Sequence, residues 1–344
     1  MTEKTAKLIK QTAEASAKEK AETAQKEGEG GHLALQKHRW VPVKLVNRQA
    51  VSDDTRTYTF ELPAGKPELG LGTCQHIQVG FHLQDKMVVR SYTPTRPVLP
   101  SPPTSPGDNT DAIPHSKEPE HPTSDRPPTP PKSPTTSSNP SPGTFDLTIK
   151  TYFPTNAQPG GALSNLLDCM PLDEEVEIRG PTGDITYLGN SDFLISHRSP
   201  SQQPRKLHFP RVSLILGGSG ITPGYALMKR IVETKGDKTE VRGVDANKME
   251  GDILLKGELD AFESESDGRV KVVHVLSRAE DGWQGERGRV DAEMLRRVLF
   301  PPGEGSVVFL CGPPGLVQGV ALPALKGMFS PLDEGAGWVS ADWG

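Results

Sequence analysis

The sequence has few cysteines, no long apolar run and no excess of basic residues. Its three cysteines (Cys74, Cys169 and Cys311) lie far apart and form no CxxC pair, which argues against a zinc site or a disulfide framework and fits a reducing compartment. The sequence contains no run of 18 apolar residues, so it gives no sign of a membrane-spanning helix. The net charge of −5 gives no sign of nucleic-acid binding. Because the first ten residues, MTEKTAKLIK, also lack the apolar core of a secretory signal, we expect a location in the cytoplasm or at the periphery of a membrane.

The N-terminal segment is one of two segments that are poor in apolar side chains. Within the first 30 residues, six Lys and six Glu surround Leu8 and Ile9, almost the only large apolar side chains. This composition favours helix but buries little surface. We therefore predict that residues 1–35 form a solvated helical tail.

The second such segment covers residues 97–143 and holds 15 of the 33 prolines, with many Ser and Thr. It cannot bury enough surface to offset its ordering entropy, so we predict a disordered Pro/Ser-rich insert within one domain. Its stretch 126–134, RPPTPPKSP, has the composition of a polyproline II ligand, which would imply a polyproline-binding partner. An inert loop explains the same composition.

Short β-branched and aromatic segments flank the insert. They cover 40–46, 55–62, 74–81 and 86–93 before it, and 144–153, 175–180 and 184–188 after it. Turn residues separate several of them, a pattern typical of an antiparallel barrel or sandwich. A glycine pair at Gly160 and Gly161 is expected to open a short helix, and a polar loop is expected near 196–210.

The stretch 211–232, RVSLILGGSGITPGYALMKRIV, reads as a buried parallel strand, a glycine turn and a helix. Such a turn lets backbone N–H groups approach a phosphate or a flat ring, although it is often only a turn. Further strands are expected near 240–245, 270–276 and 306–311. Helices are expected near 252–262, 291–299 and 314–328. This alternation predicts a doubly wound α/β domain, in which ligands bind at the carboxyl ends of the strands.

Four motifs follow one another along the chain: RSYTP at 90–94, GGALS at 160–164, GGSGITP at 217–223 and CGPPG at 311–315. Together they resemble the NADH-cytochrome b5 reductase family, which includes the flavin module of eukaryotic nitrate reductases, within the ferredoxin–NADP reductase superfamily. The resemblance implies an antiparallel six-stranded FAD-binding β-barrel over 36–190. A linker loop over 191–210 and a doubly wound α/β pyridine-nucleotide-binding domain over 211–344 would follow.

On the barrel, the resemblance implies a set of contacts with FAD. Arg90 would bind the pyrophosphate through charge-assisted bonds, Tyr92 would lie against the isoalloxazine, and Thr93 would hydrogen-bond near N5, where the hydride arrives. The glycine pair would open a helix whose N-terminus faces the pyrophosphate. Without the motifs, these residues fit ordinary strand, core or cap positions equally well. The full predicted set is Arg90, Ser91, Tyr92, Thr93, Ile149, Lys150, Tyr152, Gly160, Gly161, Ala162, Leu163 and Ser164.

On the α/β domain, Cys311 would lie beside the nicotinamide and help set the hydride geometry, so Thr93 and Cys311 are the predicted catalytic residues. Asp252 would repel a 2′-phosphate and favour NADH, or it is simply a charge that suits a helix N-terminus. Asp245 departs from the family, which usually has an aromatic residue there, and the end of the chain, 337–344, does not match the family's aromatic tail. The full predicted set is Gly218, Gly220, Thr222, Asp252, Cys311, Gly312, Pro313 and Pro314, with no metal ligand.

The resemblance therefore predicts an FAD-dependent oxidoreductase. It would take hydride from NADH and pass electrons singly to a haem protein such as cytochrome b5. A diaphorase or quinone reductase, and a nitrate-reductase-type flavin module, are the alternatives among enzymes. A degenerate reductase fold that serves as a scaffold through its proline-rich loop is the alternative outside enzymes, and the intact motifs argue against it.

Overall fold

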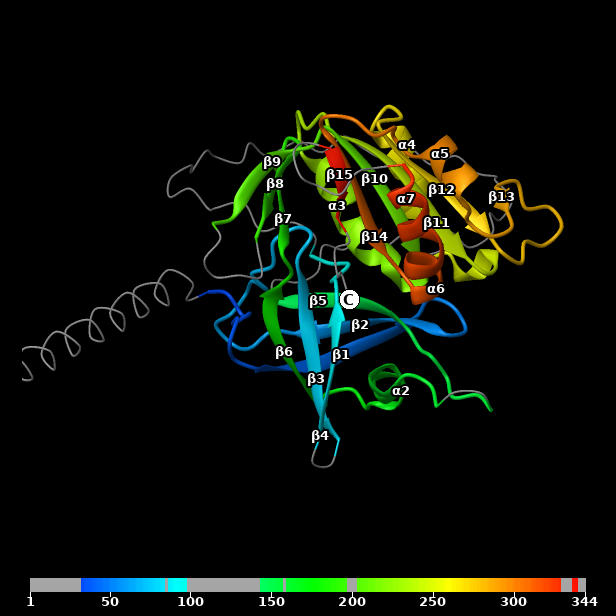
Figure 1. The fold of residues 1–344 in the computed structure, drawn as a ribbon. Helices are drawn as coiled ribbons and strands as arrows, with labels where there is room; N and C mark the ends of the chain where they lie inside the picture. The colour runs from blue at the N-terminus through cyan, green and yellow to red at the C-terminus, as the bar shows by residue number, and fades with distance from the viewer. Residues whose placement is uncertain are drawn as a thin grey trace, which may run out of the picture.

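Two domains and a small third sheet make up the described part of the chain (Figure 1). The computed structural model describes residues 32–83, 86–97, 143–156, 159–196 and 203–328, and the backbone of 336–339. Nearly all of the predicted helical tail, nearly all of the proline-rich insert with its polyproline stretch, and residues 340–344 lie outside the described residues.

The first domain is a six-stranded antiparallel sheet in the order β4-β3-β6-β1-β2-β5. In β1, Val41, Val43 and Leu45 are buried and the residues between them are less so, which is the two-residue period of a strand with one covered face. The strands are β1 (Val41–Ala50), β2 (Thr55–Glu61), β3 (His76–Leu83), β4 (Lys86–Tyr92), β5 (Thr144–Lys150) and β6 (Glu175–Thr182).

The two edges of this sheet meet where the insert begins. After edge strand β4, the Thr95 N–H donates to the Asp146 carbonyl of edge strand β5 at 2.9 Å, and the Asp146 N–H donates to the Arg96 carbonyl at 2.7 Å. The sheet is therefore barrel-like, as predicted. Phe60 and Phe145 stack in its core with ring centroids 5.4 Å apart.

The second domain is a parallel sheet in the order β13-β12-β11-β10-β14-β15, with helices on both faces, which confirms the doubly wound prediction. Its central strands β10 and β14 are buried along almost their whole length because both faces are covered. The strands are β10 (Arg211–Gly217), β11 (Glu240–Asn247), β12 (Val270–Leu276), β13 (Glu286–Arg287), β14 (Ser306–Cys311) and β15 (Ala336–Val339).

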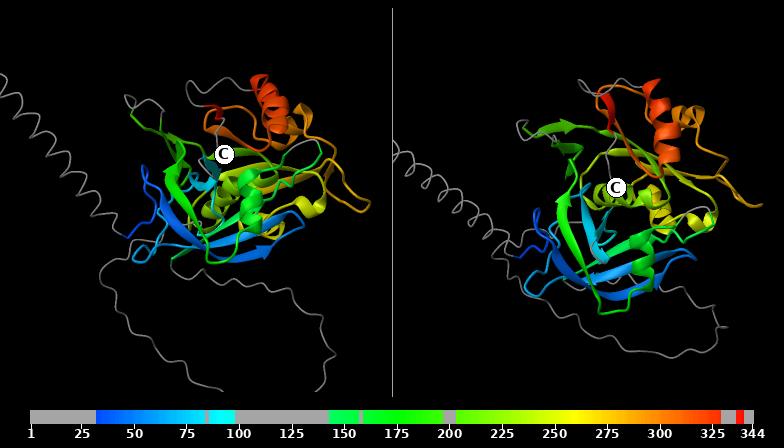
Figure 2. Two further views of the ribbon diagram at one scale, coloured as in Figure 1. Left: turned by 90° about the horizontal axis from the view of Figure 1, so that it is seen from below. Right: turned by 60° about the horizontal axis from the view of Figure 1, so that its bottom comes forward.

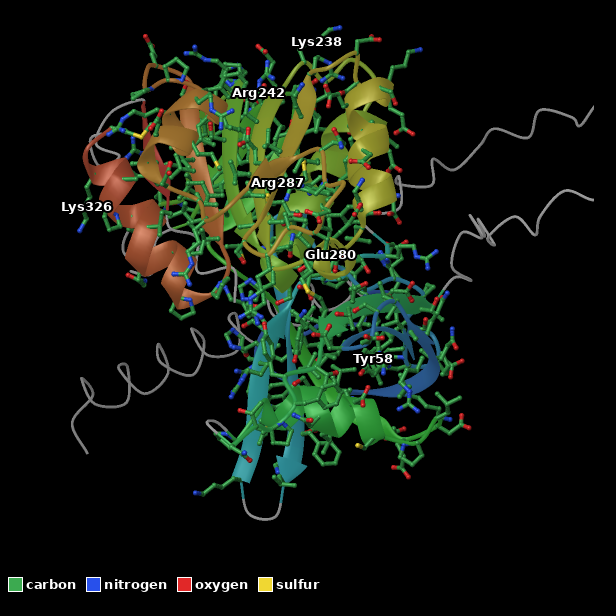
Figure 3. The ribbon with its side chains drawn as sticks, turned by 90° about the vertical axis from the view of Figure 1, so that its right-hand side faces the viewer. Tyr58, Lys238, Arg242, Glu280, Arg287 and Lys326 are labelled. Carbon is green, nitrogen blue, oxygen red and sulfur yellow. The ribbon has the colours of Figure 1, made fainter. Side chains whose placement is uncertain are left out.

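Helices α3 (Ile221–Glu233) and α4 (Lys256–Glu265) cover one face of this sheet, while α5 (Ala292–Val298) and α7 (Leu322–Lys326) cover the other. Figure 3 shows Lys238 and Arg242, near the start of β11, at the end remote from the barrel, whereas Glu280, beyond the end of β12, lies next to it. The carboxyl ends of the parallel strands therefore face the barrel.

The expected linker over 191–210 contains regular structure instead. Strands β8 (Asp192–Ile195) and β9 (Arg205–His208) pair with β7 (Ile185–Gly189) in a three-stranded antiparallel sheet beside both domains (Figures 1 and 2). Sequence pattern missed β9 because its residues, RKLH, are mostly polar and exposed. A buried carboxylate, Asp237, accepts hydrogen bonds from the Tyr187 hydroxyl and the Thr239 hydroxyl, and so ties β7 to the start of β11.

Several other bounds differ from the predictions. Strand β1 runs to Ala50, and β5 stops at Lys150. The helix expected over 252–262 begins at Lys256, after the 3₁₀ turn η2 (Glu250–Asp252), so Asp252 lies before the helix. The helix expected over 314–328 is α6 (Pro314–Leu316), the π-helical segment η3 (Val317–Ala321) and α7 in succession.

Candidate active site

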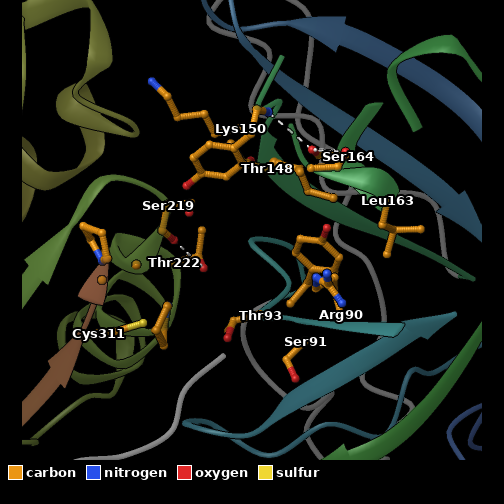
Figure 4. A pocket seen from close by; sticks show the side chains of 18 of the residues that line it. Arg90, Ser91, Thr93, Thr148, Lys150, Leu163, Ser164, Ser219, Thr222 and Cys311 are labelled. Atoms are coloured by element: carbon orange, nitrogen blue, oxygen red, sulfur yellow. Dashed lines mark hydrogen bonds between the residues drawn. The ribbon is translucent and has the colours of Figure 1, made fainter. Parts of the chain in front are cut away.

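A cavity of about 280 Å³ lies between the barrel and the carboxyl ends of the α/β strands (Figure 4). Arg90, Ser91 and Thr93 approach it from the barrel side, and Thr222 and Cys311 approach it from the α/β side. Its full lining is Arg90, Ser91, Tyr92, Thr93, Thr148, Ile149, Lys150, Tyr152, Gly161, Ala162, Leu163, Ser164, Gly217, Ser219, Gly220, Thr222, Pro223, Cys311, Gly312 and Pro313.

The end of β4 supplies one wall of the cavity. Tyr92 is the last residue of the strand, and its burial raises the pKa of its hydroxyl, which therefore stays protonated and available as a hydrogen-bond donor. Thr93 is 5% exposed, so its hydroxyl is shielded from bulk water. Arg90 is exposed, and its Nη1 donates to the Val89 carbonyl at 2.7 Å, which leaves other guanidinium N–H groups for a ligand.

Helix α2 (Ala162–Cys169) opens at the cavity. Its N-cap is Gly161, and no side chain caps the first turn, so its first N–H groups have no partner within the helix. Gly160 has φ +81°, and a Cβ there would lie 2.6 Å from the Tyr152 carbonyl oxygen. The Tyr152 N–H donates to the Ser164 hydroxyl at 3.3 Å, which fixes β5's continuation against the helix start. A helix N-terminus held open in this way suits an anion.

Two backbone turns supply the opposite wall. The turn η1 (Gly218–Gly220) follows β10, and Gly312 follows Cys311, the last residue of the neighbouring parallel strand β14. A Cβ on Gly220 would lie 2.6 Å from the Cys311 carbonyl carbon and oxygen, so only glycine permits this contact between the turns. The Thr222 hydroxyl donates to the Ser219 carbonyl at 3.2 Å, which orients the first turn of α3 at the cavity.

Lys150 lies at the edge of the cavity, where it joins the domains. Its Nζ is 2.8 Å from Asp54 Oδ2 and 2.7 Å from Asp252 Oδ1. Burial acts to lower the pKa of Lys150, but the hydrogen bonds with Asp252 and Asp54 outweigh it, so the pKa is raised and the ammonium stays charged.

Most of the predicted site residues line this cavity. Four predicted residues do not line it: Gly160, Gly218, Asp252 and Pro314. Three of them are adjacent in sequence to a lining residue, and Asp252 forms an ion pair with the lining residue Lys150. Sequence reasoning missed Thr148, Gly217, Ser219 and Pro223. The last three lie within the GGSGITP motif. Thr148 is two residues from Lys150 and therefore on the same face of β5, which was a usable signal.

Asp245, where the family usually has an aromatic residue, is fully buried. Its Oδ2 lies 3.0 Å from His274 Nδ1 and accepts from Asn247 Nδ2 at 2.9 Å. Desolvation raises the pKa of this carboxyl, although the contacts with His274 oppose the shift. An ionisable pair on β11 and β12 therefore occupies this position.

Comparisons with known proteins agree with this geometry. The family model for the oxidoreductase FAD-binding domain matches residues 42–100 and 129–187, and that for the oxidoreductase NAD-binding domain matches 214–321. NADH-cytochrome b5 reductase 3 of Rattus norvegicus is 30% identical over 297 residues, which are 85% of this chain and 84% of the relative. Nitrate reductase [NADPH] of Aspergillus niger is 32% identical over 310 residues, or 90% of this chain.

Among solved structures, the cytochrome b5 reductase domain of Ulva prolifera nitrate reductase matches with a TM-score of 0.69 and 26% identity, covering 89% of this chain and all of that one. The chain spans less than a third of the nitrate reductases that it matches, at 29% of the Aspergillus enzyme.

The fold and the two matched domains define an oxidoreductase that uses FAD and NAD. Within that class, the chain belongs to the NADH-cytochrome b5 reductase family, whose flavin module also occurs in nitrate reductases.

The residues fit FAD: a helix N-terminus and a guanidinium suit a pyrophosphate, and Tyr92 and Thr93 suit a flat ring with polar edges. None of the helices within the described ranges is long and apolar enough to cross a membrane.

Proposed function

We propose that the protein transfers hydride from NADH to FAD and passes the electrons singly to a haem protein acceptor such as cytochrome b5. The observation that carries the proposal is the position of Thr93 opposite Thr222 and Cys311 in one cavity, whose lining also includes Tyr92. A flavin ring and a nicotinamide ring placed between these walls would be held near contact. Such positioning supplies much of the rate enhancement of a hydride transfer between two rings. When bound, FAD supplies the redox chemistry, accepting a hydride and releasing single electrons.

Each wall has a separate task in this proposal. Arg90 and the N-terminus of α2 would bind the pyrophosphate, while the Thr93 hydroxyl would hydrogen-bond the edge of the flavin ring. Cys311 and the backbone of Gly220 would set the approach of the nicotinamide. Because Thr93 and Cys311 are 5% and 8% exposed, the reacting faces would be screened from bulk water.

The haem acceptor is supported by the relatives, one of which is named as a cytochrome b5 reductase. The test is the rate of NADH oxidation with cytochrome b5, ferricyanide and a quinone measured side by side on protein whose visible spectrum shows bound flavin. The proposal expects cytochrome b5 to be reduced with a kcat/KM at least tenfold above that for the quinone. A preference for the quinone would indicate a diaphorase, and a colourless protein that takes up no FAD would indicate a scaffold.

NADPH is the second candidate donor, and one observation favours it. Lys248 and Arg278 are exposed at the carboxyl ends of β11 and β12, where the Arg278 N–H donates to the Lys248 carbonyl at 2.8 Å. Basic side chains at this edge suit a 2′-phosphate. If NADPH is the donor, Arg278→Ala should raise the KM for NADPH about tenfold and leave that for NADH unchanged. An equal rise in the KM for NADPH and for NADH would show that Arg278 does not recognise the 2′-phosphate.

A further inference from the structure

We propose that Arg96 and Asp146 are positioning residues that hold the Thr93 hydroxyl at the cavity. The inference rests on the proposed function, in which Thr93 hydrogen-bonds the edge of the flavin ring. Neither Arg96 nor Asp146 lines the cavity, so both would act through the backbone that carries Thr93. We call the contacts of Thr95 and Arg96 with Asp146 the clasp.

Two backbone hydrogen bonds and one ion pair make up the clasp. The Thr95 N–H donates to the Asp146 carbonyl at 2.9 Å, and the Asp146 N–H donates to the Arg96 carbonyl at 2.7 Å. The Arg96 Nε and Nη2 lie 2.9 and 2.8 Å from Asp146 Oδ2. The Asp146 side chain is 4% exposed, whereas that of Arg96 is 42% exposed. The clasp therefore joins a buried carboxylate of β5 to the chain that continues from β4.

Thr93 lies between two fixed points of this chain. On one side, Tyr92 ends β4 and pairs with Ile77 of β3; on the other, Thr95 is held in the clasp. Pro94 restricts its own φ and also biases Thr93 towards extended backbone conformations. Because only Thr93 and Pro94 separate the two anchors, little freedom remains for the Thr93 backbone. Loss of the clasp would leave Thr93 anchored on one side only.

A chain of threonine hydroxyls links the clasp to a second part of the cavity. The Thr95 hydroxyl lies 3.2 Å from that of Thr148, which lies 3.1 Å from that of Thr57. Thr148 lines the cavity, and Thr95 and Thr148 are both buried. The clasp thus ties the segment after β4 to a cavity residue of β5, although these strands are the two edges of the barrel sheet. A shift of about 1 Å at such a site can slow a reaction about a hundredfold.

The burial of Asp146 makes the clasp sensitive to the loss of Arg96. Without the guanidinium, the buried carboxylate loses its opposing charge, and structures relieve that cost by moving the group towards water. Such a movement would pull on both backbone hydrogen bonds. The ion pair between Arg297 of α5 and Glu286 of β13, at 2.7 Å, offers a contrast, because its side chains are 58% and 31% exposed. Water screens that pair, so its loss should change little.

The first experiment compares Arg96→Ala and Arg96→Lys with the control Arg297→Ala in the FAD-loaded protein. Stopped-flow reduction of the flavin should slow about tenfold in Arg96→Ala, because Thr93 is no longer held. Arg96→Lys, which keeps the charge, should recover to within about threefold of the wild type. Arg297→Ala should be reduced at the wild-type rate. If Arg96→Ala is insoluble, Asp146→Asn takes its place, since it keeps the shape of the side chain and removes the charge.

A double-mutant cycle separates positioning from a general loss of stability. Thr93→Val removes the hydroxyl that the clasp is proposed to hold. Adding Arg96→Ala to Thr93→Val should therefore slow flavin reduction by no more than about twofold further, because the two changes act on one group. Losses that multiply, or a reduction rate in Arg96→Ala equal to that in Arg297→Ala, would overturn the proposal.

Amide hydrogen exchange gives a readout that does not depend on activity. The Thr95 and Asp146 amides both donate within the clasp, so they should exchange at least about fivefold faster in Arg96→Ala than in Arg297→Ala. Exchange equal to that of the control would also overturn the proposal. If wild-type flavin is reduced by neither NADH nor NADPH, the proposed function fails instead, and the exchange comparison still tests the clasp.

Discussion

The two walls of the active-site cavity are built in different ways. The barrel wall offers the Arg90 guanidinium and the Thr93 hydroxyl, with the start of helix α2, which no side chain caps, beside them. The α/β wall offers mainly backbone, because the turns after β10 and β14 touch at Gly220 and Cys311. In the proposed function, the barrel wall would bind FAD through charge and hydrogen bonds, whereas the α/β wall would set how closely the nicotinamide approaches the flavin.

The supporting strands differ in the same sense. Barrel strands such as β1 alternate buried and exposed residues, so one strand face is left for polar groups. Strands β10 and β14 are buried along almost their whole length and are followed by Gly220 and Gly312, where an added Cβ would crowd the backbone of the neighbouring strand end. Substitutions on the barrel wall should therefore weaken FAD binding. Substitutions on the α/β wall should slow flavin reduction, because they displace the nicotinamide.

The largest effect is expected from Gly220→Ala. A Cβ 2.6 Å from the Cys311 backbone must push the two turns apart, at a cost of about 3 kcal/mol in unfolding free energy. Flavin reduction should slow about a hundredfold because the nicotinamide face is displaced. Urea unfolding and stopped-flow kinetics test this. Gly315→Ala, where nothing lies within 4 Å of the added carbon, is the control.

The sheet beside both domains can be tested through Asp237→Asn, with an expected loss of about 2 kcal/mol at pH 7. Burial acts to raise the pKa of Asp237, but hydrogen bonds from Thr239 and Tyr187 outweigh it and the pKa is lowered below 3.8. This carboxylate therefore stabilises the fold fully above about pH 4 and loses its contribution as pH falls through the lowered value. Unfolding measured from pH 7 to pH 2.5 should show a smaller acid-induced loss in the variant. Parallel curves would contradict this assignment.

Arg90→Ala tests the barrel wall alone. Loss of charge-assisted bonds to the cofactor should weaken FAD binding by about 2 kcal/mol, or about thirtyfold, while the protein that retains flavin is reduced at close to the wild-type rate. Flavin content after gel filtration and the reduction rate per bound flavin separate the two effects. Lys86→Ala, at the other end of β4, is the matched charge control.

Cys311→Ala tests the α/β wall with the opposite expectation. Flavin reduction should slow about tenfold, equivalent to about 1.4 kcal/mol in the barrier, because the nicotinamide loses a packing contact. FAD retention should be unchanged. Flavin reduction at the wild-type rate, or a loss of flavin like that expected for Arg90→Ala, would contradict the different roles assigned to the two walls.

The smallest effect is expected from replacing residues 100–140 with a short Gly-Ser turn. Arg96 and Asp146 already bring the two ends together, with the Arg96 Nη2 2.8 Å from the Asp146 carboxylate. Shortening a loop whose ends are fixed changes closure entropy by only about 1 kcal/mol. Melting temperature and flavin content should therefore match the wild type. Insoluble or flavin-free product would show that the insert contributes to the barrel.

Much of this architecture could be predicted from sequence pattern. Strands β12 and β14 have the bounds expected for them, because apolar runs between turn residues encode buried parallel strands locally. The cavity residues in RSYTP, GGALS, GGSGITP and CGPPG could be found through the resemblance to a known family, because each motif is a contiguous stretch that can be matched. Strand β9 could not, because an exposed polar edge strand has no apolar periodicity.

The sequence by itself determined the class of fold, the cofactor motifs and the residues on each wall, since these depend on neighbours a few positions apart. Only the tertiary structure revealed that Lys150 bridges Asp54 and Asp252, and that Asp245 lies buried against His274. These contacts join residues that are distant in the chain. Their existence depends on strand register and on the packing of one domain against the other, and no local pattern of side chains carries that information.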